Sequence, residues 1–174
     1  MMHSPLMRAL VVANQSYTAK GLLPPSSCHP QSSTMVTCTR PHLGISTVTF
    51  RTYPSLGALY RAYVADARRL SGGQLKRNFG DCTKDEINGE VSWNHNYQHP
   101  KNYSVGQLAS GAIRDDKAAG RVFCTFMNGQ LYLVWTQNDG HLLAMLNGAP
   151  HENAWIWWRG IHHSIGLRGM SMHM

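Results

Sequence analysis

Three apolar runs separated by turn residues predict a three-stranded antiparallel meander over residues 120–147. The first break is Asn-Gly at 128–129, and the second is Asn-Asp-Gly at 138–140. Asn-Gly and Asp-Gly pairs readily adopt the positive φ angles that tight hairpin turns require. The tryptophan-rich stretch that follows, about 152–165, has apolar residues at helical spacing. We therefore expect a C-terminal helix whose wide aromatic face packs against the sheet.

A strand and a helix are predicted before the meander. Apolar residues recur within residues 46–53, and Pro54 ends this run. Ser55 can cap a helix over residues 56–70, where apolar side chains recur every three or four positions before a Gly-Gly pair. Residues 90–97 fit either an irregular segment or a short strand. The expected fold class is α+β, a small antiparallel sheet packed by the Trp-rich C-terminal helix and by this N-terminal helix.

Residues 1–45 differ in composition from the rest of the chain. They contain clusters of Pro, Ser and Thr, scattered Met and His, and no hydrophobic period. Such a composition buries too little apolar surface to offset the entropy of ordering. We expect residues 1–45 to be a disordered or linker-like segment, residues 46–168 a single α+β domain, and residues 169–174 a tail. The apolar run at 10–13 is too short for the core of a secretory signal peptide, so a linker and a targeting sequence both stay open for this segment.

The chain carries a formal net charge of +7, although only 14% of its residues are charged. The excess is spread out, because the first 50 residues hold three basic residues and no acid. The Arg-Arg pair at 68–69 is expected to be a solvated helix end rather than a phosphate-binding patch. We therefore expect no nucleic-acid partner. No apolar run approaches the roughly 18 residues that a membrane helix needs, so no transmembrane segment is expected either.

Two of the four cysteines, Cys82 and Cys124, lie in the expected domain. No Cys-x-x-Cys pair and no zinc-type spacing occurs. In an aromatic-rich, charge-poor domain, two isolated cysteines fit a disulfide formed in an oxidising compartment. The alternative is two unrelated buried thiols. We expect the bridge.

Aromatic, amide and imidazole side chains gather between residues 93 and 103, outside any strong periodicity. Such side chains can stack on a small ligand and hydrogen-bond to it. The alternative is that they pack into the core or satisfy the backbone of an irregular loop. The expected ligand-binding residues are Trp93, His95, Tyr97, His99 and Tyr103.

His95 and His99 would share one face of a helix and could bind a metal there, but Pro100 and the neighbouring asparagines argue against a helix. We expect no metal site. A second hypothesis is a small hydrolase or transferase in which one of these histidines is the general base, oriented by a carboxylate such as Glu90. No kinase, P-loop, zincin or serine-hydrolase motif occurs, so neither catalysis nor a cofactor is expected in the leading hypothesis.

Four short motifs resemble a pattern in extracytoplasmic domains of actinobacterial membrane proteins, including regions that follow the transmembrane helix of serine/threonine kinases. They are Gly-x-x-x-Cys at 120–124, Trp-Thr at 135–136, Leu-Leu-Ala at 142–144 and Trp-Trp at 157–158. Cys82 is similar to the upstream partner cysteine of that pattern. The resemblance implies a secreted or cell-surface, sensor-like domain without catalysis, which binds a small ligand or a cell-envelope partner.

Overall fold

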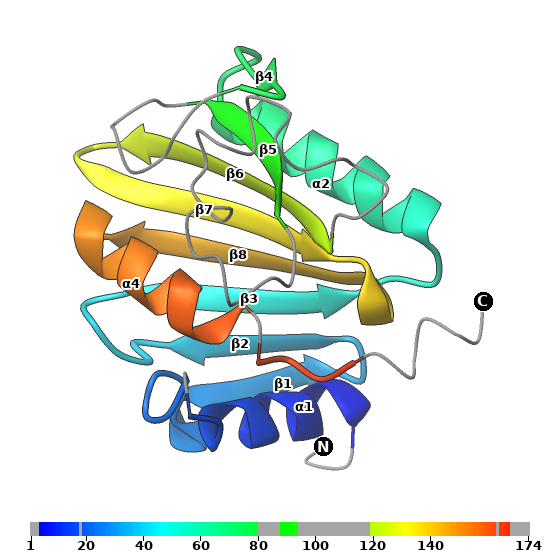
Figure 1. The fold of residues 1–174 in the computed structure, drawn as a ribbon, viewed down its shortest axis with the longest axis vertical. Helices are drawn as coiled ribbons and strands as arrows, with labels where there is room; N and C mark the ends of the chain where they lie inside the picture. The colour runs from blue at the N-terminus through cyan, green and yellow to red at the C-terminus, as the bar shows by residue number, and fades with distance from the viewer. Residues whose placement is uncertain (1–3, 18, 80–87, 94–118, 163, 168–174) are drawn as a thin grey trace.

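The computed structural model describes residues 4–17, 19–79, 88–93, 119–162 and 164–167, and all structural statements below refer to these residues. They form an eight-stranded sheet in the order β1-β2-β3-β8-β7-β6-β5-β4, with helices on both of its faces (Figure 1). Neighbouring strands are antiparallel except β4 and β5. The strands are β1 (Cys28–Ser32), β2 (Met35–Thr39), β3 (Thr47–Thr52), β4 (Lys76–Arg77), β5 (Gly89–Trp93), β6 (Gly120–Met127), β7 (Gln130–Gln137) and β8 (Leu142–Ala149). The helices are α1 (Pro5–Asn14), α2 (Leu56–Leu70) and α4 (His151–Ile161), with short 3₁₀ turns η1 (Pro25–Ser27) and η5 (Asp139–His141).

The predicted meander is confirmed as β6, β7 and β8. Asn128 and Gly129 adopt φ angles of 54° and 77° in the first turn, as a tight hairpin requires. The second turn is η5, in which Gly140 has a φ of 78°. The α+β class is confirmed as well, but the expected sheet of three strands was too small. Strand β3 pairs with β8 and β5 pairs with β6, so the meander is the centre of a larger sheet.

The prediction of a disordered or linker-like segment at residues 1–45 is wrong, because this part of the chain forms α1, η1, β1 and β2. In this segment, buried residues lie on one face of α1 and at alternate positions of β2. In α1 the buried positions are Leu6, Met7, Ala9, Leu10 and Ala13. The β1–β2 hairpin extends the sheet from β3, and Cys28 and Cys38 lie opposite each other in it and form a disulfide. Composition alone underestimated how much apolar surface this segment buries, because the segment packs into the same core cluster as the rest of the chain. The tail expected at 169–174 lies outside the described residues.

Helix α2 forms where the sequence predicts it. The Ser55 hydroxyl oxygen accepts a hydrogen bond from the Ala58 N–H at 3.1 Å, which caps the first turn. Leu59, Tyr63 and Ala67 then follow one another along the buried face. This face packs on one side of the sheet, against Phe123, Val134 and Leu143.

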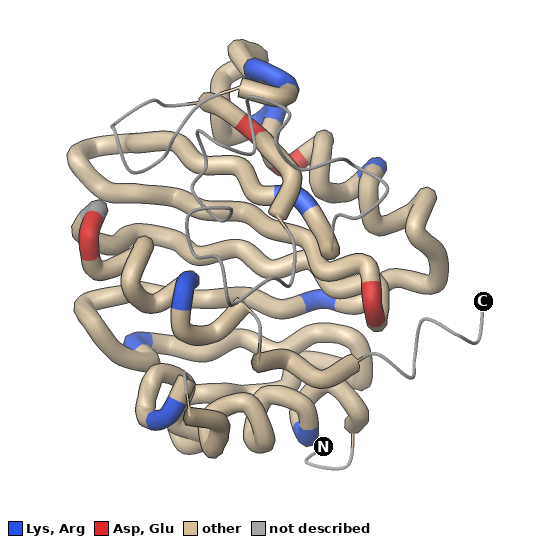
Figure 2. The backbone as a smooth tube through the Cα atoms, viewed as in Figure 1, with Lys and Arg blue, Asp and Glu red and all other residues tan. Residues whose placement is uncertain are grey.

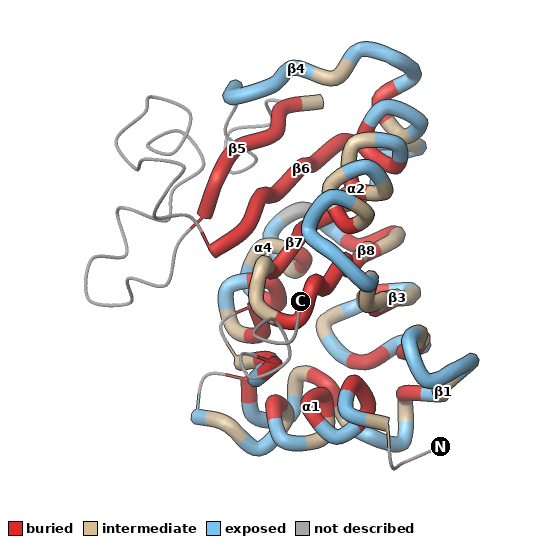
Figure 3. The backbone as a smooth tube through the Cα atoms, turned by 90° about the vertical axis from the view of Figure 1, so that its right-hand side faces the viewer, coloured by how far each residue is buried: buried red, intermediate tan, exposed pale blue. Residues whose placement is uncertain are grey.

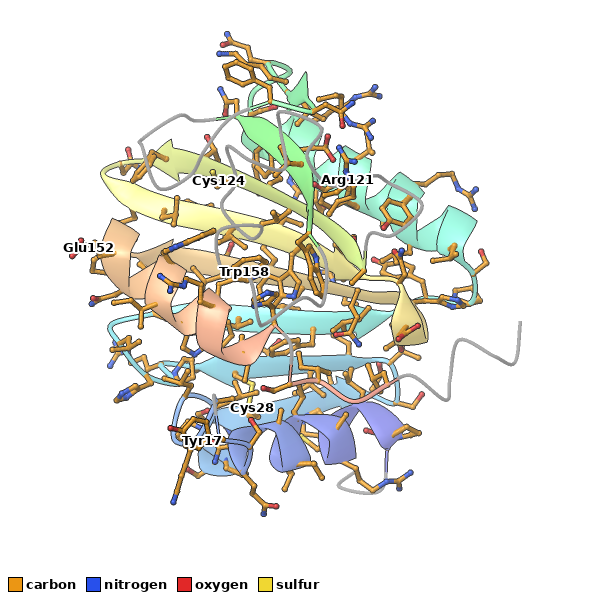
Figure 4. All side chains as sticks on the ribbon, in the orientation of Figure 1. Tyr17, Cys28, Arg121, Cys124, Glu152 and Trp158 are labelled. Carbon is orange, nitrogen blue, oxygen red and sulfur yellow. A yellow bond between two sulfur atoms is a disulfide. The ribbon has the colours of Figure 1, made fainter. Side chains whose placement is uncertain are left out.

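Helix α4 covers the opposite side of the sheet, as the side view in Figure 3 shows. Its residues Trp157 and Trp158 are fully buried, which confirms the expectation that the aromatic stripe belongs to the core. Trp157 meets Trp135 of β7 in an edge-to-face contact with ring centroids 6.0 Å apart. Trp158 is labelled in Figure 4 and stacks on the ring of His162, with centroids 3.7 Å apart. Helix α1 joins the same core cluster at the β1 end of the sheet.

Strand β5 is held close to β6 by a glycine. A Cβ atom on Gly120 would collide with the backbone oxygen of Thr136 and would lie 2.7 Å from Nε1 of Trp93. The absent side chain lets the Trp93 indole N–H donate to that oxygen at 2.9 Å. The contact fixes the end of β5 and therefore the position of the polar residues on this strand. None of the described helices is both long and apolar enough to span a lipid bilayer.

Candidate functional site

The most unusual polar residue of the sheet is Glu90, on the α2 side of β5, whose side chain is 0% exposed. Its Oε1 atom accepts hydrogen bonds from Arg121 Nε at 2.6 Å and from the Tyr63 hydroxyl at 3.2 Å. Its Oε2 atom accepts from Arg121 Nη2 at 2.7 Å, from Arg77 Nε at 2.9 Å and from the Asn78 backbone N–H at 3.1 Å. A buried carboxylate is costly unless it is paired and hydrogen-bonded, and Glu90 meets both conditions.

Arg121 is the buried partner of this carboxylate, and Figure 4 labels it on β6. Only 8% of the residue is exposed. Besides its two bonds to Glu90, it donates to the hydroxyl oxygen of Ser92 at 2.6 Å and to the side-chain oxygen of Asn78. The two charges therefore neutralise each other inside the protein.

The protonation states of the cluster follow from these contacts. Burial alone would raise the pKa of Glu90, but the hydrogen bonds and charge of Arg121, followed by the bonds from Arg77 and Asn78, bring this pKa below its usual value. Burial, together with the charge of Glu90, raises the pKa of Tyr63 well above its usual value. Glu90 is thus ionised and Tyr63 neutral at neutral pH. Neither group is poised to exchange a proton in that range.

A groove of about 550 Å³ runs along α2 next to this cluster. It is lined by Gly57, Tyr60, Arg61, Val64, Ala65, Arg68 and Arg77. The six α2 residues recur three or four positions apart, so they form one face of the helix. This face adjoins the face that packs on the sheet, because Tyr60 and Val64 are half-buried against the same core cluster. Arg77 comes from β4 and joins them because Glu90 holds its side chain at this place. We call this the α2 groove.

Positive charge dominates the α2 groove. Arg61 and Arg68 are exposed, and the side chain of Arg77 is 50% exposed although its Nε is bound to Glu90. Glu90 pairs with both Arg77 and Arg121, so these three groups together keep one net positive charge. Among the described residues, no carboxylate lines the groove. Figure 2 shows the basic positions along α2 and on β4.

The aromatic wall of the α2 groove is Tyr60. Its hydroxyl donates to the side-chain oxygen of Asn138 and accepts from the Thr136 hydroxyl at 3.2 Å. Its ring also meets the ring of Tyr63 edge to face, with centroids 6.0 Å apart. These contacts fix the ring, which therefore offers the groove a rigid apolar surface.

The residues expected to bind a ligand are placed only in part. Trp93 is fully buried, and its indole N–H is bonded to the Thr136 backbone, so its side chain is part of the core rather than the open contact surface that we expected. The other expected positions, His95, Tyr97, His99 and Tyr103, lie outside the described residues. The carboxylate suggested as a partner for the histidines, Glu90, has both oxygens engaged elsewhere.

The expected Cys82–Cys124 bridge stays a prediction. Cys124 is disulfide-bonded and lies in the core cluster on the α4 side of β6. Cys82 lies outside the described residues. The Cys28–Cys38 bridge was not anticipated, because both residues fall in the segment that we expected to be unstructured. Within the described residues, no group of three or more His, Cys, Asp or Glu side chains could hold a metal ion.

Sequence reasoning also missed the α2 groove. It treated Arg68 as part of a solvated helix end, and only the seven-residue spacing of Arg61 and Arg68 on the exposed helix face could have indicated a shared surface. No local pattern indicated Arg77, because its place depends on a carboxylate 13 positions later in the chain.

Fold and site together define an α+β domain that has an eight-stranded, disulfide-linked sheet and an arginine-lined groove beside one helix. No protein-family model, no curated protein and no solved structure matches this chain.

Proposed function

We propose that this chain is a non-catalytic, extracytoplasmic domain that binds an anionic ligand or partner in the α2 groove. One observation carries the proposal: Arg61, Arg68 and Arg77 line the same groove, and no described carboxylate lines it with them. Positive charges that border one groove give it a positive potential, which attracts an anion. The planar guanidinium group also suits this task, because it binds carboxylate and phosphate groups through two parallel hydrogen bonds.

The absence of catalysis is supported by the chemistry beside the groove. The nearest buried carboxylate, Glu90, is held ionised, and both its oxygens accept hydrogen bonds from the protein. A general base must have a free lone pair within reach of the substrate. Binding requires no general base, since fixed charges and a rigid aromatic wall are sufficient to hold a ligand.

The extracytoplasmic compartment is supported by the cysteines. Cys28 and Cys38 are joined, and Cys124 is disulfide-bonded as well. Disulfides form and persist mainly in oxidising environments. The resemblance to sensor-like domains of membrane serine/threonine kinases agrees with this proposal. In such a system the domain would supply ligand binding, and another domain would supply the response.

Calorimetric titration tests the binding part of the proposal. Phosphate, sulfate and citrate are titrated at constant ionic strength into the wild type, into an Arg61→Ala/Arg68→Ala double variant and into Arg69→Ala. Arg69 is the matched control, because it lies on the same helix, pairs with Asp66 at 2.8 Å and does not line the groove. At least one anion should bind the wild type and lose roughly 5- to 30-fold in affinity in the double variant, since each exposed charge pair contributes up to about 1 kcal/mol. Binding of none of them, or an equal loss in Arg69→Ala, would refute the proposal.

The compartment is tested separately. Thiols are alkylated in intact cells of the native host before lysis, and the peptides are then mapped without reduction. A bridged peptide pair containing Cys28 and Cys38 is expected. Alkylated Cys28 and Cys38 would place the chain in a reducing compartment and remove this part of the proposal.

A further inference from the structure

We infer that the α2 groove binds a small phosphate monoester, with the phosphoryl group held by Arg61, Arg68 and Arg77 and the carbon body lying on Tyr60 and Val64. The inference rests on the proposed function and narrows it to one ligand chemistry. It assigns a head group to the arginines and an apolar contact to the residues between them.

The charge of the site favours a dianion. Glu90 carries one negative charge while Arg77 and Arg121 carry one positive charge each, so these three groups keep one net positive charge, which adds to those of Arg61 and Arg68. A phosphate monoester carries about −1.5 to −2 at pH 7. A sulfate ester or a monocarboxylate carries a single negative charge and would leave more of the repulsion among the arginines in place.

Arg77 is positioned in advance for such a ligand. Its Nε donates to Glu90 Oε2 at 2.9 Å, and the Asn78 backbone N–H donates to the same oxygen at 3.1 Å. The guanidinium group is thus anchored at one edge while half of the side chain remains exposed. A donor that is already ordered loses little conformational entropy when the ligand arrives. Glu90 therefore acts as a positioning residue for Arg77.

The two helix arginines flank the groove. Arg61 and Arg68 lie seven residues apart, which is about two helical turns and roughly 10 Å along α2. Val64 lies between them on the same face. In the structure Nη1 of Arg61 lies over Gly57, 3.3 Å from where a Cβ atom of that residue would be, so this side chain must turn toward Val64 to share one phosphoryl group with Arg68. An arginine side chain is long and flexible enough for this movement.

The size and lining of the groove indicate a ligand that is larger than an inorganic ion and has an apolar part. A volume of about 550 Å³ falls within the roughly 300–1,000 Å³ of small-molecule sites. The Tyr60 hydroxyl is engaged with Asn138 and Thr136, so the contribution of Tyr60 to the ligand is its ring. Tyr60, Val64 and Ala65 thus form an apolar strip beside the arginines, on which a compact carbon skeleton can lie.

Phenyl phosphate, phenyl sulfate and benzoate provide the test, because they share one body and differ in head group. Each is titrated calorimetrically at pH 7.5 and constant ionic strength, together with inorganic phosphate. Phenyl phosphate should bind roughly tenfold or more tightly than phenyl sulfate or benzoate, as expected for one additional charge contact in a partly desolvated site. Inorganic phosphate should bind more weakly than phenyl phosphate, because it lacks the body that contacts Tyr60.

Substitutions test the position of the head group. Arg77→Ala should weaken phenyl phosphate binding roughly tenfold or more, Arg77→Lys should recover part of the loss, and Arg69→Ala should have no effect. Glu90→Gln frees Arg77, so adding Arg77→Ala to Glu90→Gln should change the affinity for phenyl phosphate less than Arg77→Ala does in the wild type. Circular dichroism confirms in each case that the variant is folded before it is titrated.

A pH series separates the dianion from other anions. A phosphate monoester takes up its second proton near pH 6. The groups around it are Arg61, Arg68 and Tyr60 from α2 and Arg77 from β4, with Glu90 and Arg121 behind. The guanidinium group is not deprotonated in proteins, and the lowered pKa of Glu90 keeps that carboxylate ionised. Affinity for phenyl phosphate should therefore fall about tenfold from pH 7.5 to 5.0, while affinity for phenyl sulfate stays constant.

The outcomes are distinct. Phenyl phosphate that binds no more tightly than phenyl sulfate, or that binds equally well at both pH values, overturns the inference. If binding of phenyl sulfate or benzoate still depends on Arg61 and Arg68, the proposed function stands although the inference of a phosphate monoester is wrong. If binding of none of the compounds depends on these arginines, both the inference and the proposed function are wrong.

Discussion

Replacing Glu90 with glutamine tests the energetic role of the buried cluster. The substitution keeps the shape of the side chain and removes its negative charge, so the buried Arg121 loses the carboxylate that it binds through two hydrogen bonds. Removing one partner of a buried ion pair costs about 3–5 kcal/mol. A domain is typically stable by only about 5–15 kcal/mol, so the variant should lose a large fraction of its free energy of unfolding.

The same variant has a defined pH dependence. The pKa of Glu90 is lowered in the folded protein, so the carboxylate stabilises the fold at pH values above the unfolded pKa of about 4.3. This stabilisation is lost as the pH falls through the folded pKa. The difference in free energy of unfolding between wild type and Glu90→Gln should therefore have its full size at pH 7 and pH 5.5 and should shrink below about pH 4.

Urea unfolding followed by tryptophan fluorescence at pH 7, 5.5 and 3.5 measures both effects. Glu152→Gln is the control, because it makes the same chemical change at an exposed residue in the first turn of α4 and should cost no more than about 1 kcal/mol. The double variant Glu90→Gln/Arg121→Met should lose less than the sum of the two single variants, since it leaves no uncompensated charge from the pair. A Glu90→Gln protein within about 1 kcal/mol of wild type at pH 7 would refute the reasoning.

Three further outcomes are expected from urea unfolding. Gly120→Ala should destabilise the fold by about 1–3 kcal/mol through collision with the neighbouring strand, whereas Gly166→Ala, with open space around it, should be nearly neutral; equal effects would contradict the packing argument. Replacing Cys28 and Cys38 by serine removes a bridge of sequence separation 10 and should cost about 2.7 kcal/mol on the chain-entropy model, a difference that should vanish under reducing conditions. Cys82→Ser should cost about 2–5 kcal/mol and free one alkylatable thiol, detected by intact mass; an unchanged thiol count would exclude the predicted bridge.

The elements that the sequence predicts correctly are those encoded by neighbouring residues. The meander is marked by turn residues at 128–129 and 138–140, where backbone conformation and sequence agree. Helix α2 is marked by Ser55 and by the repeat of its buried face. Each of these signals fits within one hairpin or one helix, so no knowledge of the rest of the fold is needed to recognise it.

The features that it does not predict depend on residues far apart in the chain. The bonds from Glu90 to Arg77 and to Arg121 join residues 13 and 31 positions apart. No periodicity connects such residues, so the cluster and the α2 groove beside it emerge only when β4, β5 and β6 are aligned. Strands β1 and β2 were missed for a related reason, because each gains its burial from a core built by other parts of the chain.

The pairing of β3 with β8 has a consequence for the order in which the protein can assemble. This pairing places Thr47 opposite Asn147, a hundred positions further along the chain. During synthesis, β3 has no permanent neighbour on that side until β8 has left the ribosome. Contacts between such distant residues make folding slow. The Cys28–Cys38 disulfide joins two residues of a single hairpin, so it can form early. It can then keep β1 and β2 in register before β8 is synthesised.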